Sequence, residues 1–229
     1  MQLRGILFDL DGTLLDLDLD AFLRRYFRAL SQATAPHFPG VDVMPAVLAS
    51  TAAMQRPHPG ATNREVFAED FRERTGIDVE ARWDVFDDFY RDVFPTLGDG
   101  YGPVPGAREA IAQARALDLK VAVATQPIFP VAAIMHRLDW AGLSEVAFDA
   151  VTTYETMLAC KPLPAYFEQT AAMIGCAPGE CLMVGDDRAM DMPAAAVGMR
   201  TFYVGRDPEA PADHRGTMAD LAAMLRRLV

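Results

Sequence analysis

Short runs of apolar residues, each ending in a polar or acidic residue, recur along most of the chain. Such runs are typical of strands that are buried on both faces of a parallel sheet. They lie at residues 4–10, 120–125, 147–153, 181–186 and 200–204. Segments with helical spacing of apolar residues follow them, at 107–117, 131–138, 165–174, 189–196 and 217–228. From about residue 102 onward, the pattern predicts an α/β fold, a doubly wound parallel sheet with right-handed crossovers.

Residues 17–95 do not follow this alternation, because they show amphipathic helical patterns without a convincing strand. The expected helices are 21–33, 43–54, 63–75 and 80–94. Asp20 is the expected N-cap of the first, since its side-chain oxygen can accept a hydrogen bond from a free backbone N–H. We interpret 17–95 as an inserted all-helical cap domain, and 1–16 with 96–229 as the core domain. A Gly- and Pro-rich stretch at 98–106 returns the chain to the core.

Composition is that of an ordinary globular protein, with 51% hydrophobic and 23% charged residues in a chain of 229. The formal net charge is −11. Nucleic acid is therefore not expected as a partner, because phosphate backbones are bound by basic surfaces. A small phosphate ester is still compatible with this charge, provided that a metal ion and a lysine reverse the local potential.

No membrane association is expected, since the longest uncharged stretch, 121–136, contains two prolines and is shorter than the ~20 apolar residues of a membrane span. The N-terminal sequence does not resemble a signal or transit peptide, because acidic residues follow its first apolar run directly. Cys160, Cys176 and Cys181 form no zinc-like pair and are expected as reduced thiols. The expectation is a cytoplasmic protein, either a monomer or a homodimer.

Two aspartates follow the first apolar run, in the sequence Asp9-Leu10-Asp11-Gly12-Thr13. Residues i and i+2 of an extended chain project to the same side, so both carboxylates can face one ligand. Gly12 then lets the chain turn away. Ligands of open α/β sheets bind beyond the carboxyl ends of the strands, which is where this pair is expected.

Polar residues also follow three further strand-like runs. The hydroxyl of Thr125 and the N–H groups after it can hold phosphoryl oxygens, and Lys161 offers a cation on a turn. Asp186, Asp187 and Asp191 add acids at another strand end. Carboxylates that gather at one edge raise each other's pKa values unless a cation lies among them. Oxygen ligands without His or Cys favour Mg²⁺ as that cation.

In this order, the motifs resemble those of the haloacid dehalogenase (HAD) superfamily. They are DLDGT at Asp9, the strand-terminal Thr125, Lys161-Pro162, and GDDRAMD from Gly185. The match spans almost the whole chain, and the first and last motifs are the specific ones. A helical insert between the first motif and Thr125 is similar to the helical-cap branch of that superfamily. The resemblance implies a Rossmann-like core that carries such a cap.

The resemblance also implies that Asp9 attacks phosphorus and forms an aspartyl-phosphate intermediate. Asp11 would protonate the leaving oxygen and later activate water. Thr125 and the backbone of Gln126 would bind phosphoryl oxygens, and Lys161 would neutralise charge on Asp9 and the phosphate. Asp11, Thr125, Gln126 and Lys161 would thus surround the phosphoryl group.

The ligands that the resemblance implies for Mg²⁺ are Asp9, the main-chain carbonyl of Asp11, and Asp186. Asp191 is expected to orient the lysine of the third motif or metal-bound water. Asp187 and Asp191 are additional candidate ligands.

One departure from the family pattern is Gln126-Pro127 after Thr125, where relatives commonly carry Asn or Ser. Asp11 favours phosphate chemistry over carbon–halogen cleavage, because dehalogenases of the superfamily lack this second acid. The favoured function is a Mg²⁺-dependent phosphatase for a small phosphorylated metabolite. Two alternatives stay open, phosphomutase-type phosphoryl transfer and a non-catalytic HAD-fold binding protein. Motifs of P-loop ATPases, dehydrogenases and serine hydrolases are missing from the sequence.

Overall fold

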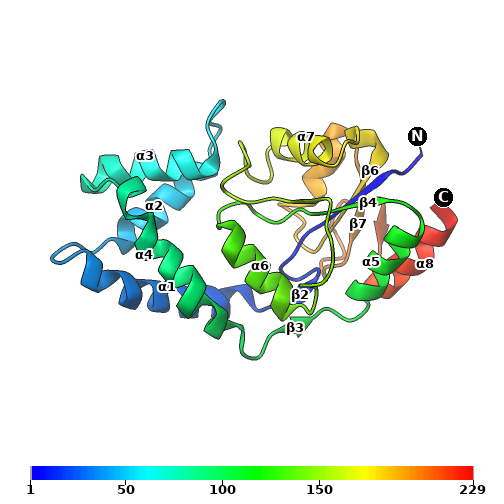
Figure 1. The fold of residues 1–229 in the computed structure, drawn as a ribbon. Coiled ribbons are helices and arrows are strands. Elements are labelled where there is room, and N and C mark those ends of the chain that lie inside the picture. Colours follow the sequence, from blue (N-terminus) through cyan, green and yellow to red (C-terminus); the bar gives the residue numbers. More distant parts are fainter. Residues whose placement is uncertain (1, 229) are drawn as a thin grey trace.

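A parallel sheet with helices on both faces forms the core of the computed structural model, which describes residues 2–228 (Figure 1). Six strands lie in the order β5-β4-β1-β6-β7-β8, and every neighbouring pair is parallel. They are β1 (Gly5–Phe8), β4 (Lys120–Val123), β5 (Ala150–Val151), β6 (Cys181–Gly185), β7 (Arg200–Tyr203) and β8 (His214–Arg215). The predicted doubly wound parallel sheet is confirmed.

The central strand β1 is buried along its whole length, and its side chains alternate between two hydrophobic cores. Ile6 and Phe8 pack in one core with residues of α5, α6 and α8. Leu7 packs in a second core with residues of α7. These helices are α5 (Ala107–Ala116), α6 (Val131–Trp140), α7 (Pro164–Met173) and α8 (Met218–Leu228). Burial on both faces explains why the strand is a continuous apolar run rather than an alternating one.

Four α-helices make up most of the cap, which lies at the end of the core away from both termini (Figure 1). They are α1 (Leu19–Thr34), α2 (Met44–Met54), α3 (Asn63–Thr75) and α4 (Trp83–Asp88). The carboxylate of Asp18 accepts a hydrogen bond from the backbone N–H of Ala21 at 3.0 Å. The N-cap of α1 is therefore Asp18, and the expectation of Asp20 was wrong by two residues.

The last helix expected in the cap, 80–94, is broken into short pieces. A 3-10 turn (Glu80–Arg82) precedes α4, and a π-helical turn (Phe89–Val93) and a 3-10 turn (Phe94–Gly98) follow it. The wider π turn is where the neighbouring Phe89 and Tyr90 are both buried. Pro95 has no N–H donor, so the α-helical hydrogen bonding cannot continue through it.

Other differences from the expected elements occur in the second half of the chain. The segment expected as a helix at 189–196 forms a 3-10 helix, Met192–Val197, in which Pro193 lacks an N–H donor near the start. The strand expected at 147–153 is reduced to the two residues of β5. The two-residue strand β8 was not expected. Each of these elements is too short to carry a clear periodic signal.

Among the contacts between cap and core, three involve the two chain crossings and the start of α3. The two chain crossings lie side by side as antiparallel strands, β2 (Leu15–Asp16) and β3 (Gly102–Pro103). At the start of α3, Asn63 forms the third link, because its Nδ2 donates to the carbonyl of Pro127 and its backbone N–H to that of Met157, both at 2.8 Å. The cap is thus inserted into the core, while its limits at residues 17 and 95 stay a prediction.

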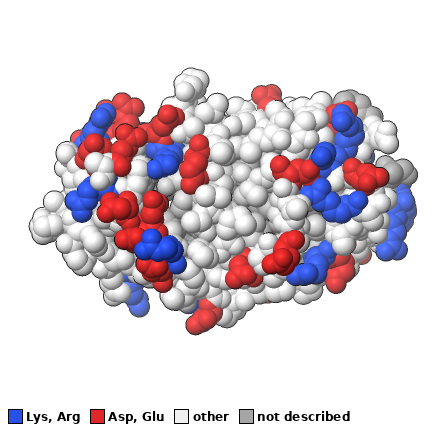
Figure 2. Space-filling model, viewed as in Figure 1, with Lys and Arg blue, Asp and Glu red and all other residues white. Residues whose placement is uncertain are grey.

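Charged side chains on the face shown in Figure 2 gather over the cap and over the opposite end of the core, with a largely uncharged band between them. Lysines and arginines are interspersed with aspartates and glutamates in both groups. This face therefore presents both signs of charge side by side. Among the described residues, no helix combines the length and apolar character needed to span a bilayer.

Candidate active site

Asp9 stands at the carboxyl end of the central strand. It follows the last residue of β1, and its backbone N–H donates to the carbonyl of Val184 in the neighbouring strand β6, at 2.9 Å. The side chain is largely buried, with 12% of its surface exposed. β1 and β6 thus fix Asp9 at the carboxyl ends of the parallel strands.

The loop after Asp9 turns at Gly12, which has a φ of 80°. The backbone N–H of Gly12 donates to the carbonyl of Leu15 at 2.8 Å and closes this turn. A Cβ atom at position 12 would clash with the carboxylate of Asp186, which follows β6. Glycine is therefore required both by the left-handed backbone and by the close approach of the first and fourth motifs.

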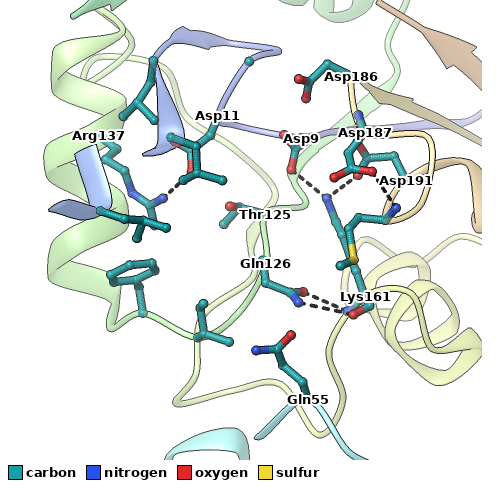
Figure 3. A pocket seen from close by; sticks show the side chains of 17 residues that line it. Asp9, Asp11, Gln55, Thr125, Gln126, Arg137, Lys161, Asp186, Asp187 and Asp191 are labelled. Carbon is teal, nitrogen blue, oxygen red and sulfur yellow. Dashed lines mark hydrogen bonds and ion pairs between the residues drawn. The ribbon is translucent and has the colours of Figure 1, made fainter. Parts of the chain in front are cut away.

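Lys161 lies between two carboxylates in the interior (Figure 3). Its Nζ is 2.6 Å from Oδ1 of Asp9 and 2.6 Å from Oδ1 of Asp191, and its side chain is 2% exposed. Burial alone would lower the pKa of Lys161, but the charges of Asp191 and Asp9 outweigh burial and hold that pKa above its usual range. The lysine is thus a fixed cation within the site.

Three carboxylates converge beside this lysine. One oxygen from each of Asp9, Asp186 and Asp191 lies within 4.8 Å of the other two. Burial, and after it the negative charge of Asp9, raise the pKa of Asp186 to about 7. Burial also raises the pKa of Asp9, although Lys161 opposes this effect. The three acids therefore share one lysine as their cationic neighbour.

A hard divalent cation fits this donor set. The three side chains offer only oxygen atoms, which Mg²⁺ prefers over nitrogen or sulfur. A cation among them would also offset the charge that raises the pKa of Asp186. Asp9, Asp186 and Asp191 thus form a group of acids that could hold a metal ion.

Asp187 has a different position from the other acids of the fourth motif. Its Oδ1 accepts hydrogen bonds from the backbone N–H groups of Ala189 and Met190, at 2.7 and 3.1 Å. Its own N–H donates to Oδ2 of Asp191 at 3.0 Å. The Asp187 side chain therefore shapes the turn that carries Asp191.

Gln126 connects the second motif to the third. Its Oε1 accepts the backbone N–H of Lys161 at 2.9 Å, and its Nε2 donates to the carbonyl of Lys161 at 3.2 Å (Figure 3). Thr125 precedes it and is 2% exposed. The carbonyl of Thr125 accepts hydrogen bonds from the hydroxyls of Thr152 and Tyr166, at 2.8 and 2.9 Å. The Gln126 side chain thus fixes the loop that carries the lysine.

Asp11 is turned away from the acidic cluster and toward helix α6 (Figure 3). Its Oδ2 lies 2.5 Å from Nη1 of Arg137, an arginine whose side chain is 1% exposed. The Arg137 guanidinium also stacks over the ring of Phe129, 4.6 Å from its centroid. The two aspartates of the first motif therefore have different cationic partners.

A cavity of about 310 Å³ joins these residues. Asp9, Asp11, Thr125, Gln126, Lys161 and the three acids of the fourth motif all line it. The rest of its wall is mainly apolar, with Gln55 as a polar group from the cap. Its further lining residues are Gly12, Leu17, Leu19, Leu23, Ile128, Phe129, Arg137 and Met190.

The fold and motif geometry agree with the family to which the sequence can be matched. Residues 3–198 match the haloacid dehalogenase-like hydrolase family. The chain belongs to this family. The HAD phosphatase from Thermococcus onnurineus has the same fold at 22% identity, with a TM-score of 0.59 over 97% of this chain and 98% of that one.

Two relatives extend the comparison of this HAD-like hydrolase. Hexitol phosphatase A of Escherichia coli (strain K12) is 29% identical over 214 residues, which are 92% of this chain and 87% of that protein. Protein SUPPRESSOR OF QUENCHING 1, chloroplastic, of Arabidopsis thaliana is 32% identical over 133 residues. That match covers 58% of this chain but 12% of the relative, so the chain spans only a small part of that protein's length.

Two polar residues that line the cavity of the HAD-like site were not expected from the sequence, Arg137 and Gln55. A signal for Arg137 existed, because it lies on the face of α6 that buries Ala133 and Ile134, where a charge is unusual. Gln55 follows the last residue of α2 and reaches the cavity only because the cap folds over the core. Its sequence context gave no indication of that position.

Proposed function

We propose that this HAD-like hydrolase is a Mg²⁺-dependent phosphatase that acts on a small phosphorylated metabolite. The observation that carries the proposal is the position of Lys161, whose ammonium group bridges Asp9 and Asp191 beside Asp186. Such an arrangement can hold a nucleophilic carboxylate, a cation and a phosphoryl group within reach of one another.

In the proposed first step, a carboxylate oxygen of Asp9 forms a bond to phosphorus while the bond from phosphorus to the leaving oxygen breaks. The leaving oxygen takes a proton from Asp11. Water then forms a bond to the phosphorus of the aspartyl-phosphate and gives a proton to Asp11, while the bond from phosphorus to the Asp9 oxygen breaks. This step releases inorganic phosphate and restores the Asp9 carboxylate. Asp9 and Asp11 both line the cavity, which supports their action on the same substrate.

The remaining residues of the site bind and orient in this proposal. Lys161 neutralises charge on Asp9 and on the phosphoryl group, and Thr125 with the backbone of Gln126 binds phosphoryl oxygens. Mg²⁺, held by Asp9, Asp186 and the main-chain carbonyl of Asp11, would neutralise further charge on those oxygens. Asp191 holds Lys161 in place through its hydrogen bond.

The balance of charge around the cavity favours a phosphatase over a phosphomutase. Among the described residues that line it, acids outnumber the two cations, Lys161 and Arg137. Both cations are already paired with carboxylates. A bisphosphate activator needs free cationic groups for its second phosphate. A single phosphate ester is the better fit, and the likeness to hexitol phosphatase A supports a compact one.

Replacement of the nucleophile tests the proposal. We expect Asp9→Asn to lower phosphate release from 4-nitrophenyl phosphate by ~10³-fold or more, because an amide is a poor nucleophile. Acid quenching of the wild-type reaction should trap one phosphoryl group on the peptide that contains Asp9, as measured by mass spectrometry. Asp20→Asn, an exposed change in the cap, is the matched control and should leave turnover unchanged. Unchanged turnover of Asp9→Asn would contradict the proposal.

A further inference from the structure

Arg137 is a buried cation that hydrophobic packing does not explain. It lies in α6 among core residues and contacts Asp11, the acid that we propose for proton transfer. Its Nε and Nη2 atoms are buried and have no hydrogen-bond partner, and the same is true of Oδ1 of Asp11. Burial of polar groups without partners costs free energy, and an apolar residue in place of a buried ion pair is often neutral or stabilising. Stability alone is therefore a weak reason for an arginine at this position.

We propose that Arg137 is a positioning residue, which holds the Asp11 carboxylate at the side of the cavity where the leaving group is bound. This inference rests on the proposed phosphatase function. Asp9 and Lys161 lie on one side of Thr125 and Asp11 with Arg137 on the other (Figure 3). A phosphoryl group at Asp9 would thus direct its leaving oxygen toward Asp11. Arg137 exchanges no proton, because a guanidinium stays charged.

The contacts of Arg137 suit a residue that holds the Asp11 side chain in one position. Its polar contact to Asp11 spans 2.5 Å, and its other strong contact is the ring of Phe129. Phe129 in turn packs edge-on against Tyr26 of the cap, with ring centroids 5.3 Å apart. Arg137 therefore connects Asp11, through Phe129, to Tyr26 in helix α1 of the cap.

The dependence of the rate on the leaving group tests this role. A 4-nitrophenolate leaves without protonation, whereas an alkoxide requires it, so loss of a positioned acid should affect the second much more. We expect Arg137→Gln to lower kcat/KM for benzyl phosphate by ~10²-fold and for 4-nitrophenyl phosphate by less than ~3-fold. The constant kcat/KM is chosen because it reports the step that forms the phosphoryl-enzyme. Both substrates are measured with Mg²⁺ present.

Three control variants separate positioning from a structural role. Ile134→Ala weakens the packing of the same helix and should leave the ratio of the two kcat/KM values unchanged. Arg137→Lys keeps the charge and should recover part of the loss with benzyl phosphate. In an Asp11→Asn background, Arg137→Gln should have little further effect, since both changes remove the same proton donor.

Equal losses for both substrates in Arg137→Gln and Arg137→Lys would overturn the proposal. Additive losses in the double variant with Asp11→Asn would also overturn it. If Arg137→Gln fails to fold, the same ratio is read from Arg137→Lys. Failure of the proposed function gives a different result, because Asp9→Asn then keeps its turnover. If the function holds and only the role of Arg137 fails, Asp9→Asn loses its turnover while Arg137→Gln affects both substrates equally.

Discussion

Gly12 is a single position on which the geometry of two motifs depends. It combines a left-handed φ with a close approach to Asp186, so a methyl group there would displace that carboxylate. We expect Gly12→Ala to lower kcat by ~10²-fold or more with Mg²⁺ present, because charge stabilisation at the phosphoryl group depends on the displaced side chain. Steady-state kinetics over a range of Mg²⁺ concentrations measures this effect.

Gly60→Ala is the matched control for this change. Gly60 also has a left-handed backbone, with a φ of 91°, but no atom lies within 4 Å of the Cβ position. Both variants should lose ~1 kcal/mol of stability from backbone strain, whereas only Gly12→Ala should lose activity. Equal kcat values for the two variants would show that contact with Asp186 is unimportant.

At the residue scale, the sequence was informative for side chains whose location in the fold follows from their position after a strand. Asp9, Lys161 and Asp186 each follow a strand of one parallel sheet, so their meeting at one edge could be expected from the pattern. The pairing of Asp11 with Arg137 could not, because it depends on the rotation of α6 against the sheet and on the side-chain rotamers. Separation along the chain gives no information on such contacts.

At the element scale, most long apolar patterns were reliable, whereas short ones and the long pattern at 80–94 were not. The predicted helix at 63–75 is α3, and in the structure Thr62 and Glu65 form a capping box at its start. The break of the helix expected at 80–94 could not be predicted in the same way, since aromatic residues there recur at helical spacing. Packing of those aromatic rings within the cap selects the π turn at Phe89–Val93.

Asp149 stabilises the start of β4 and gives a prediction for this element. Its carboxylate accepts the backbone N–H of Val121 at 2.8 Å and pairs with Lys120 and Arg115 at 3.0 and 2.5 Å. Burial alone would raise the pKa of Asp149, but these hydrogen bonds outweigh burial and lower it. The stabilisation is therefore present above the pKa of the unfolded chain and is lost as the pH falls through the lower folded value.

We expect Asp149→Asn to lower the Tm by ~2–4 °C at neutral pH, which corresponds to ~1 kcal/mol for a chain of this size. The difference from the wild type should shrink below about pH 4, where the carboxylate of the unfolded chain is protonated. Thermal melts followed by circular dichroism across this pH range measure it. Asp139→Asn, an exposed change in α6, should show no such dependence. A constant difference at all pH values would contradict the assignment.

At the scale of the whole molecule, the acidic cluster should couple metal binding to stability. Mg²⁺ that binds only the folded chain adds ~2.7 kcal/mol at 100 times its Kd, or a rise in Tm of ~5–10 °C. Asp186→Asn should remove most of this rise. Without Mg²⁺ the same variant should be at least as stable as the wild type, because it relieves repulsion from Asp9. Differential scanning calorimetry with and without Mg²⁺ measures both effects.

Asp20→Asn is the control for this coupling, since it removes an acid outside the cluster. It should keep the full rise in Tm. A rise that persists in Asp186→Asn would place the stabilising ion elsewhere on this acidic chain.

The insertion of a cap could be predicted at this scale, because residues 17–95 interrupt an alternating pattern. How the cap sits on the core could not be predicted. That arrangement depends on contacts such as those of Asn63, which joins α3 to the carbonyls of Pro127 and Met157. From sequence alone, an asparagine at the start of a helix indicates an N-cap residue rather than a side chain that is hydrogen-bonded to a distant loop.

Asn63 also ties the cap to the two loops that carry Gln126 and Lys161. Pro127 follows Gln126, and Cys160, whose Sγ lies 3.3 Å from Nδ2 of Asn63, precedes Lys161. Any outward displacement of α3 would break both contacts together, so the two loops share one point of attachment to the cap.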